Sequence, residues 1–229
     1  MVGNPICVAL DSPDQDTMLA IARATKDHVG VYKIGLTAFA SGGPRLVQIL
    51  AADRPVFLDL KLHDIPMQVA GAVAAVGASG ARYTTVHASG GAEMLQAAVN
   101  AAGDVVVLAV TLLTSLGDDD LAGIGMTGSA EEAVLRFADV ALHAGVPGLV
   151  CSPLELNVLR ARFGSRDSGG PLLVVPGIRS EPSPGDDQRR TLSARAAIER
   201  GADMIVVGRP ITATRDPGAA ARALVDEIS

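Results

Sequence analysis

The chain has 229 residues, of which 48% are hydrophobic and 19% charged, so it is long and apolar enough to bury a sizeable core and is not a disordered protein. Its 19 basic and 25 acidic side chains give a net charge of −6, which opposes binding to nucleic acid or to an anionic membrane. Aromatic residues make up only 3% and tryptophan is absent, so the core is expected to consist of Ala, Val, Leu and Ile, which suits helices packed on a sheet.

The first residues give no sign of a targeting segment. Residues 1–10 lack the basic stretch that opens a signal peptide. The longest apolar run, 105–113, is far too short to span a bilayer. Cys7 and Cys151 form no CxxC motif and no disulfide framework, so both are expected to be buried free thiols. Together these features predict a cytoplasmic protein.

Eight short runs rich in β-branched residues recur along the chain, with helical stretches between them. The runs are almost continuously apolar, as expected for parallel strands that helices cover on both faces. The predicted strands are 6–10, 31–35, 56–60, 83–87, 105–110, 148–151, 172–175 and 204–207.

Capping signals mark helices between these strands. Ser12 is predicted to cap a first helix, with Pro13 at the first helical position and Gln15 completing a capping box. Two further helices, each ending near a glycine suited to a left-handed C-cap, are predicted at 127–144 (Gly145) and 193–200 (Gly201).

The alternation of eight strands with helices predicts an α/β protein, a single (β/α)8 TIM barrel domain over residues 1–229. The alternative is a doubly wound open sheet, which typically uses fewer strands for this length. In a barrel, functional groups gather at the carboxyl ends of the strands. The residues at those ends are Asp11, Lys33, Asp59, Lys61, His87, 111–115, Ser152, Arg179, Gly208 and Arg209.

The densest chemistry follows the third predicted strand. Asp59 and Lys61 are two residues apart, so at a strand end both side chains point into the barrel mouth. Lys33, at the end of the neighbouring strand, is expected to reach them. A salt-bridge network that merely closes the barrel is the alternative, but buried charge is costly unless it is paired or used. Interleaved lysines and aspartates would form a preorganised field around an anionic ligand.

A phosphate site is predicted after the last two strands. Gly208 lets backbone N–H groups approach a phosphate, and the guanidinium of Arg209 adds a fork of donors. The loops after strands 7 and 8 are the recurring phosphate site of this fold. Arg179 and Gln188 belong to the Pro- and Gly-containing stretch 176–190, which is either a solvated loop or a lid that grips the phosphate on closing.

Eight short motifs follow one another along the chain: A-L-D, Y-K-I-G-L, D-L-K-L-H-D-I-P, T-V-H-A-S-G-G, V-T-L-L-T-S, P-G-I-R, D-D-Q-R-R and V-G-R-P-I-T. Together they resemble the orotidine 5′-phosphate decarboxylase family over essentially the whole chain. D-x-K-x-x-D alone defines a wider suprafamily that includes metal-dependent keto-sugar-phosphate decarboxylases and synthases. D-I-P, P-G-I-R and D-D-Q point to the orotidylate branch, and so does Lys33, because the metal-dependent relatives have an acidic residue near that strand end.

The resemblance implies decarboxylation of orotidine 5′-monophosphate to UMP and CO2 in de novo pyrimidine synthesis, with no metal and no organic cofactor. Lys61 would protonate C6 and stabilise the developing carbanion, while Asp59 would lie against the substrate carboxylate. Asp64 is expected to come from the other subunit of a homodimer and to complete a Lys33–Asp59–Lys61–Asp64 array. The other implied contacts are Asp11 and Lys33 to the ribose, Thr114 to the pyrimidine, Arg179, Gln188, Gly208 and Arg209 to the phosphate, and Ile65, Pro66 and Gln68 around the substrate.

One position departs from the family pattern. After D-I-P the family usually has Asn-Thr, whereas this chain has Met67 and Gln68. The Thr of the family contacts the substrate ribose from the partner subunit, so Gln68 stands at that place here.

Two other functions are compatible with parts of the pattern. One is a metal-dependent lyase or aldolase acting on a sugar phosphate, which a chelator would inactivate. The other is a non-catalytic phosphate-binding barrel, against which the intact D-x-K-x-x-D argues, because binding needs no isolated proton donor among carboxylates. His63 and His87 have no partner at metal-ligand spacing and are predicted to be structural or supporting residues.

Overall fold

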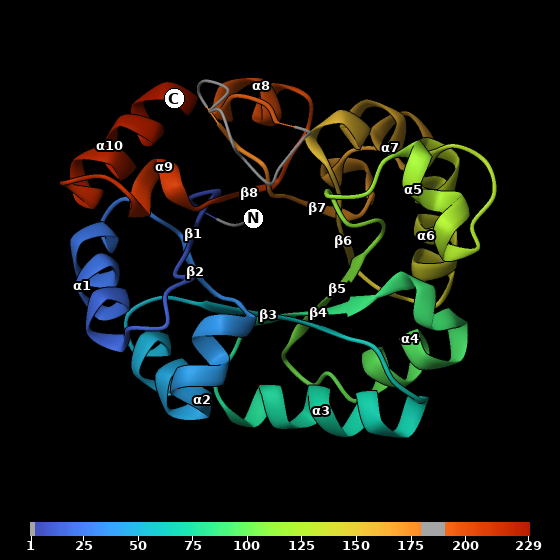
Figure 1. Cartoon of the computed structure of the whole chain (residues 1–229), viewed down its shortest axis with the longest axis horizontal. Helices are drawn as coiled ribbons and strands as arrows, with labels where there is room; N and C mark the ends of the chain where they lie inside the picture. Colours follow the sequence, from blue (N-terminus) through green and yellow to red (C-terminus); the bar gives the residue numbers. More distant parts are fainter. Residues whose placement is uncertain (1–2, 180–190) are drawn as a thin grey trace.

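The chain folds into a closed barrel of parallel strands (Figure 1). The computed structural model describes residues 3–179 and 191–229. Neighbouring strands pair in chain order, and β1 pairs with β8 to close the barrel. The (β/α)8 barrel predicted from the sequence is therefore confirmed. Its strands are β1 (Ile6–Ala9), β2 (Val31–Ile34), β3 (Val56–Leu62), β4 (Tyr83–His87), β5 (Val106–Val110), β6 (Gly148–Val150), β7 (Leu172–Val175) and β8 (Met204–Val207).

The largest difference from the predicted strand bounds is at the carboxyl end of β3. This strand continues to Leu62 instead of ending at residue 60. Its register against β4 shifts between Leu58 and Leu62, and Lys61 adopts a φ of 51°, in the left-handed region that few residues other than glycine occupy. The irregularity lies at the barrel mouth and determines where the Lys61 side chain points.

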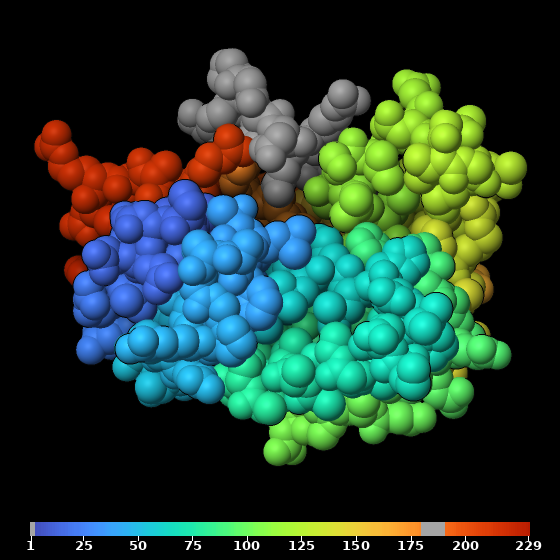
Figure 2. Space-filling model, turned by 60° about the horizontal axis from the view of Figure 1, so that its bottom comes forward, coloured from blue at the N-terminus to red at the C-terminus, as the bar shows by residue number. Residues whose placement is uncertain are grey.

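A ring of helices surrounds the barrel, and α10 lies beside α1 where the ring closes (Figure 1). Seen from another side, α1, α2 and α3 form a continuous outer surface, coloured blue to teal (Figure 2). The α-helices are α1 (Gln15–Thr25), α2 (Leu36–Ala51), α3 (Pro66–Ala78), α4 (Gly91–Asn100), α5 (Asp118–Leu121), α6 (Ala130–His143), α7 (Leu156–Phe163), α8 (Ala194–Glu199), α9 (Arg209–Thr212) and α10 (Pro217–Ile228). Short 3-10 turns are η1 (Ala88–Gly90), η2 (Ala122–Ile124), η3 (Pro153–Glu155) and η4 (Arg166–Ser168).

The prediction that Ser12 caps the first helix is wrong. Asp14 caps α1, and its carboxylate accepts a hydrogen bond from the backbone N–H of Thr17 at 3.0 Å. Ser12 instead accepts a hydrogen bond from the backbone N–H of Asp14. The charged carboxylate is favoured at this place because the amino end of a helix carries partial positive charge.

The other two predicted helices are slightly shorter than expected, and α6 differs most at its start. Ser129 caps α6, so this helix begins at Ala130 and not at residue 127. Ser193 caps α8 and is not part of it. After each helix the chain turns at a glycine of positive φ, 85° at Gly145 and 95° at Gly201, as the sequence predicts.

Apolar side chains form two layers. Inside the barrel, a small cluster includes Cys7, Leu108 and Val174. In the same cluster, Phe57 and Tyr83 meet edge to face, with ring centroids 6.3 Å apart. The larger cluster contains mostly Ala, Val, Leu and Ile from the strands and the helices that cover them. This division agrees with the composition, because small aliphatic side chains let helices approach the sheet closely.

The two cysteines are buried free thiols, as predicted. Cys7 lies on β1 inside the barrel, and Cys151 follows β6. Within residues 3–179 and 191–229, no helix is both long and apolar enough to span a membrane.

Candidate active site

A cavity of about 480 Å³ opens at the carboxyl ends of the strands. Apolar side chains, among them Phe57, Val110 and Leu112, form much of its wall. The structure brings eight of the residues singled out from the sequence together around this space, and they come from both halves of the chain. They are Asp11, Lys33, Asp59, Lys61, Thr114, Arg179, Gly208 and Arg209.

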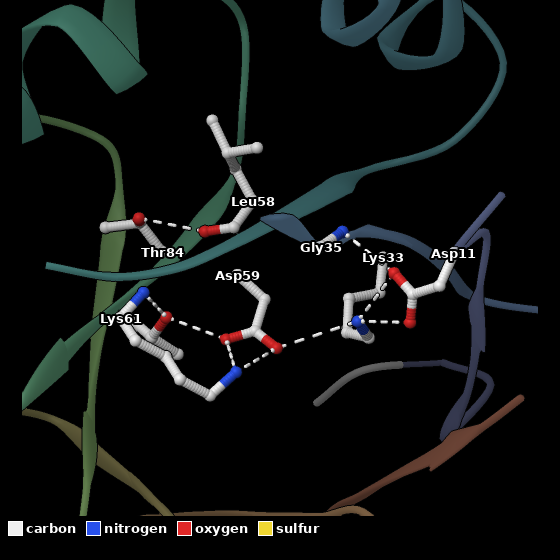
Figure 3. Close-up of polar contacts among 8 residues, drawn as sticks. Asp11, Lys33, Gly35, Leu58, Asp59, Lys61 and Thr84 are labelled. Carbon is white, nitrogen blue, oxygen red and sulfur yellow. Dashed lines mark hydrogen bonds and ion pairs between the residues drawn. The ribbon is translucent and has the colours of Figure 1, made fainter. Parts of the chain in front are cut away.

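The charged side chains alternate in sign across the first three strands (Figure 3). Lys33 Nζ lies 2.9 Å from Asp11 Oδ2 and 3.6 Å from Asp59 Oδ2. Lys61 Nζ donates to both carboxylate oxygens of Asp59 at 2.9 Å. Asp59 therefore lies between the two ammonium groups, and the side chains of Lys33 and Asp59 are only 10% and 13% exposed.

Burial and charge act in opposite directions on these groups. Burial disfavours the ionised carboxylate of Asp59, but the charges of Lys33 and Lys61 outweigh it and hold its pKa below the ordinary value. Burial also disfavours the ammonium of Lys33, but Asp11 and Asp59 raise its pKa above the ordinary value. Both groups are consequently charged at neutral pH, so a strong, fixed field fills the cavity mouth.

Thr85 holds the centre of this array in place. Its hydroxyl donates to Asp59 Oδ1 at 2.8 Å and accepts from the backbone N–H of Lys61 at 2.8 Å. The adjacent Thr84 points the other way and donates to the carbonyl of Leu58. Sequence analysis missed Thr85. The available signal was a pair of hydroxyl side chains in an otherwise apolar strand, where a buried polar group needs a partner.

Gly35, also missed from the sequence, lets the chain approach Asp11. Its backbone N–H donates to Asp11 Oδ1 at 3.1 Å. A Cβ added at this position would collide with the same oxygen and would come within 3.1 Å of Lys33 Nζ. Glycine is therefore needed between β2 and α2 because there is no room for a side chain, and not because of an unusual φ.

The last two strands supply the remaining polar wall. Gly208 follows β8, and Arg209 opens α9 directly after it. Arg179 follows β7, and its backbone N–H donates to the carbonyl of Leu192 at 2.9 Å. Ile178 and Arg179 are thus paired with Leu192 just after the end of β7. Gln188, predicted to reach the same region, lies outside the described residues.

Four residues predicted to touch the substrate lie away from this cavity. Asp64, Ile65 and Pro66 line a separate open hollow, which shares no lining residue with the cavity. Gln68 lies in the first turn of α3 and is exposed. Ile65 is 60% exposed and its neighbour Met67 is 75% exposed, so this segment presents apolar surface to its surroundings.

His63 lines this hollow and lies against His87, the other histidine of the motifs. The rings of His63 and His87 lie 5.4 Å apart between centroids. Burial, and then the nearby His63 and Lys61, lower the pKa of His87 below its ordinary value. Over the part of the chain that the structure describes, no group of three metal-ligating side chains is present.

The fold and the site define a (β/α)8 barrel with a Lys–Asp array at its mouth, and known proteins share both. Residues 4–224 match the model of the orotidine 5′-phosphate decarboxylase / HUMPS family. A protein of Anaeromyxobacter sp. (strain K), named orotidine 5′-phosphate decarboxylase, is 51% identical over 96% of each chain. One of the same name from Thermobifida fusca (strain YX) is 46% identical over 98% of this chain and 95% of its own.

A solved structure agrees with these matches. The crystal structure of orotidine 5′-phosphate decarboxylase from Lactobacillus acidophilus superposes with a TM-score of 0.87 at 35% identity and covers 99% of both chains. The chain belongs to the orotidine 5′-phosphate decarboxylase / HUMPS family.

Proposed function

We propose that this protein is a carboxy-lyase that converts orotidine 5′-phosphate to UMP and CO2. The observation that carries the proposal is the Lys33–Asp59–Lys61 array at the mouth of the cavity, in a chain whose relatives at 46–51% identity are named for this reaction. A metal-dependent decarboxylase or aldolase of sugar phosphates is not favoured. The ammonium group of Lys33 already lies between the carboxylates of Asp11 and Asp59. A metal ion at these carboxylates would be repelled by that positive charge.

Lys61 is the proton donor of the proposed reaction. The bond between C6 and the carboxyl carbon breaks, CO2 leaves, and the electron pair stays on C6. Lys61 Nζ then gives its proton to C6, and its charge stabilises the carbanion as it forms. Asp59, held by Thr85 and both lysines, orients that ammonium group and lies beside the departing carboxylate.

The rest of the cavity binds the parts of the substrate that do not react. Asp11 and Lys33 bind ribose hydroxyls, and Thr114 binds the pyrimidine. Arg179, Gly208, Arg209 and Gln188 bind the phosphate. Binding of the phosphate, far from the breaking bond, favours a closed site around C6 from which water is excluded. The remote binding energy thereby lowers the activation free energy of decarboxylation.

A homodimer completes the site. Asp64, Ile65 and Pro66 line a hollow apart from their own chain's cavity, so they are free to serve the cavity of a second subunit. The exposed apolar side chains of Ile65 and Met67 support contact with that subunit. Gln68 would then take the position of the ribose-contacting residue of the family. The buried thiols support the proposal that the protein works in a reducing cytoplasm.

An absorbance assay tests the proposed function. The purified protein is mixed with orotidine 5′-phosphate, loss of substrate absorbance is followed, and UMP is identified by chromatography, with and without EDTA. We expect conversion at the same rate in both samples. No conversion, or conversion that EDTA abolishes, would contradict the proposed reaction or its independence of metal.

A further inference from the structure

A second cavity lies at the opposite end of the barrel. It measures about 810 Å³ and is lined by the first residues of three strands, Tyr83 of β4, Val106 of β5 and Leu172 of β7. The active-site cavity opens at the carboxyl ends of the strands, so the two spaces are separate. Phe57 lines the active-site cavity and Tyr83 lines the second cavity. The two rings meet edge to face between the two cavities.

The phenol of Tyr83 is a buried donor without a partner in the described chain. Tyr83 is only 9% exposed. Its hydroxyl makes no hydrogen bond to any of residues 3–179 and 191–229. Tyr32, the other tyrosine, donates its hydroxyl to the carbonyl of Ala22 at 2.8 Å. Tyr83 lines the cavity, so its hydroxyl is available to donate a hydrogen bond to a molecule bound there.

Four arginines line the same cavity, and of these only Arg160 has all of its guanidinium nitrogens bonded to residues that the structure describes. Its guanidinium donates to the carbonyls of Gly201, Gly164 and Pro171 and pairs with Asp203 at 2.6 Å. Arg160 thus has a structural role: it links these backbone segments and neutralises the carboxylate of Asp203.

The other three guanidinium groups have N–H donors that bond to no residue in the described part of the chain. Arg82 and Arg166 each donate to one backbone carbonyl, and Arg200 makes no hydrogen bond or ion pair with any described residue. Two carboxylates, Asp167 and Glu199, also line the cavity, but neither lies within 4.0 Å of an arginine in the described chain. Three unpaired cations against two acids leave this end of an acidic protein locally positive.

Apolar side chains complete the lining, among them Val106, Leu172, Ile198 and Ala202. We propose that this cavity is a second ligand site, which binds a small molecule with an oxyanion on an apolar body. The arginines would hold the oxyanion, the Tyr83 hydroxyl would donate to it, and the apolar wall would cover the body. A phosphate ester and a carboxylate share this chemistry.

Ring-labelled tyrosine provides a direct reporter, because the chain has two tyrosines and no tryptophan. The protein is titrated with phenyl phosphate, benzoate and inorganic phosphate, and the NMR signals of Tyr83 and Tyr32 are followed. We expect the Tyr83 signals to shift at millimolar concentration or below, while the Tyr32 signals stay in place. Tighter binding of phenyl phosphate than of benzoate identifies a phosphate ester as the ligand class, and the reverse identifies a carboxylate. If none of the three probes shifts Tyr83, the proposal is wrong.

Matched variants separate this site from the active site. Arg200→Ala should weaken binding of the preferred probe about tenfold or more, since it removes a charge-assisted contact. Arg195→Ala changes an exposed arginine of α8 that does not line this cavity, and Arg209→Ala changes an arginine of the active-site cavity. Both should leave the Tyr83 shift unchanged. Equal affinity of the Arg200→Ala and Arg195→Ala proteins, or loss of the shift in Arg209→Ala, would overturn the assignment.

Tyr83→Phe gives a readout that a purely structural tyrosine would not give. The variant should be about as stable as the parent without ligand, because the Tyr83 hydroxyl bonds to no residue that the structure describes. The rise in Tm caused by the preferred probe should be smaller than in the parent. A variant that unfolds more easily without ligand, or that gains as much Tm from the probe, would contradict a ligand bond to Tyr83.

Discussion

Lys33 and Asp59 are the residues on which the electrostatics of the site depend. Each is nearly buried, and each is ionised because the other is close. Removing one partner of such a buried pair leaves the other charge buried without compensation, which typically lowers the free energy of unfolding by about 3–5 kcal/mol. The pair is therefore a poor device for stability alone, and its value lies in the field that it presents to a ligand.

Thr85 offers a test of how that field is positioned. Thr85→Val removes the bonds to Asp59 and to the Lys61 backbone, so kcat/KM for orotidine 5′-phosphate should fall about tenfold or more. Thr84→Val is the matched control, since Thr84 is equally buried but bonds only to the Leu58 carbonyl. Both variants should lose about 1–3 kcal/mol of unfolding free energy. An equal loss of kcat/KM in both would show that Thr85 acts only through stability.

His87 should make the protein less stable in acid. Its pKa in the folded chain is below 6.5, the ordinary value, so the unfolded chain binds more protons as the pH falls below about 6.5. The stability contributed by neutral His87 is present above that pH and is lost as the pH falls through the folded pKa. Urea unfolding at about pH 7.5 and about pH 5.5 measures the loss.

In His87→Gln the loss of unfolding free energy between these two pH values should be smaller than in the parent. His143→Gln, which changes an exposed histidine on α6, is the control and should lose as much as the parent. If His87→Gln is as sensitive to acid as the parent, His87 is not the group that titrates.

At the scale of the elements, the junction between β2 and α2 determines how Asp11 meets Lys33. Gly35→Ala places a methyl group against Asp11 Oδ1, so Asp11 must move away from the Lys33 ammonium. We expect KM for orotidine 5′-phosphate to rise about tenfold or more, because the proposed ribose contacts are lost. Gly123→Ala, in open space, should change little. An unaltered KM in Gly35→Ala would separate Asp11 from substrate binding.

The strands could be predicted closely because parallel strands covered on both faces appear in the sequence as apolar runs. β4, β7 and β8 have the predicted bounds. Helix starts were harder to place, because Ser12 and Asp14 both have oxygens that can cap and only the folded chain decides between them. The predicted strand ends located the charged array, and the resemblance of motifs then assigned a role to each of its members.

Features that depend on contacts between distant residues could not be predicted. The extension of β3 to Leu62 comes from its shifted pairing with β4 and not from its own residues. The role of Thr85 depends on Asp59, 26 positions away in the sequence, and that of Gly35 on Asp11, 24 positions away. Spacing along one strand cannot show such contacts.

At the scale of the whole molecule, the proposed homodimer with shared sites can be tested by subunit mixing. Lys61→Ala and Asp64→Ala proteins, each nearly inactive, are mixed after dissociation and reassociated. Half of the dimers should be hybrids in which one of two sites has both groups, so activity should recover to about a quarter of the parent level. No recovery, once hybrid dimers are demonstrated, would mean that Asp64 serves its own chain.

The most direct test of the central claim is the turnover of Lys61→Ala. The chain has three lysines, and the exposed Lys26, changed to Ala, serves as the control. Because Lys61 supplies both the proton and the charge that faces the carbanion, kcat should fall by roughly 10⁴-fold or more, whereas UMP should still bind and Lys26→Ala should keep its activity. A Lys61→Ala protein that retains most of its kcat would contradict the assignment of Lys61 as the proton donor.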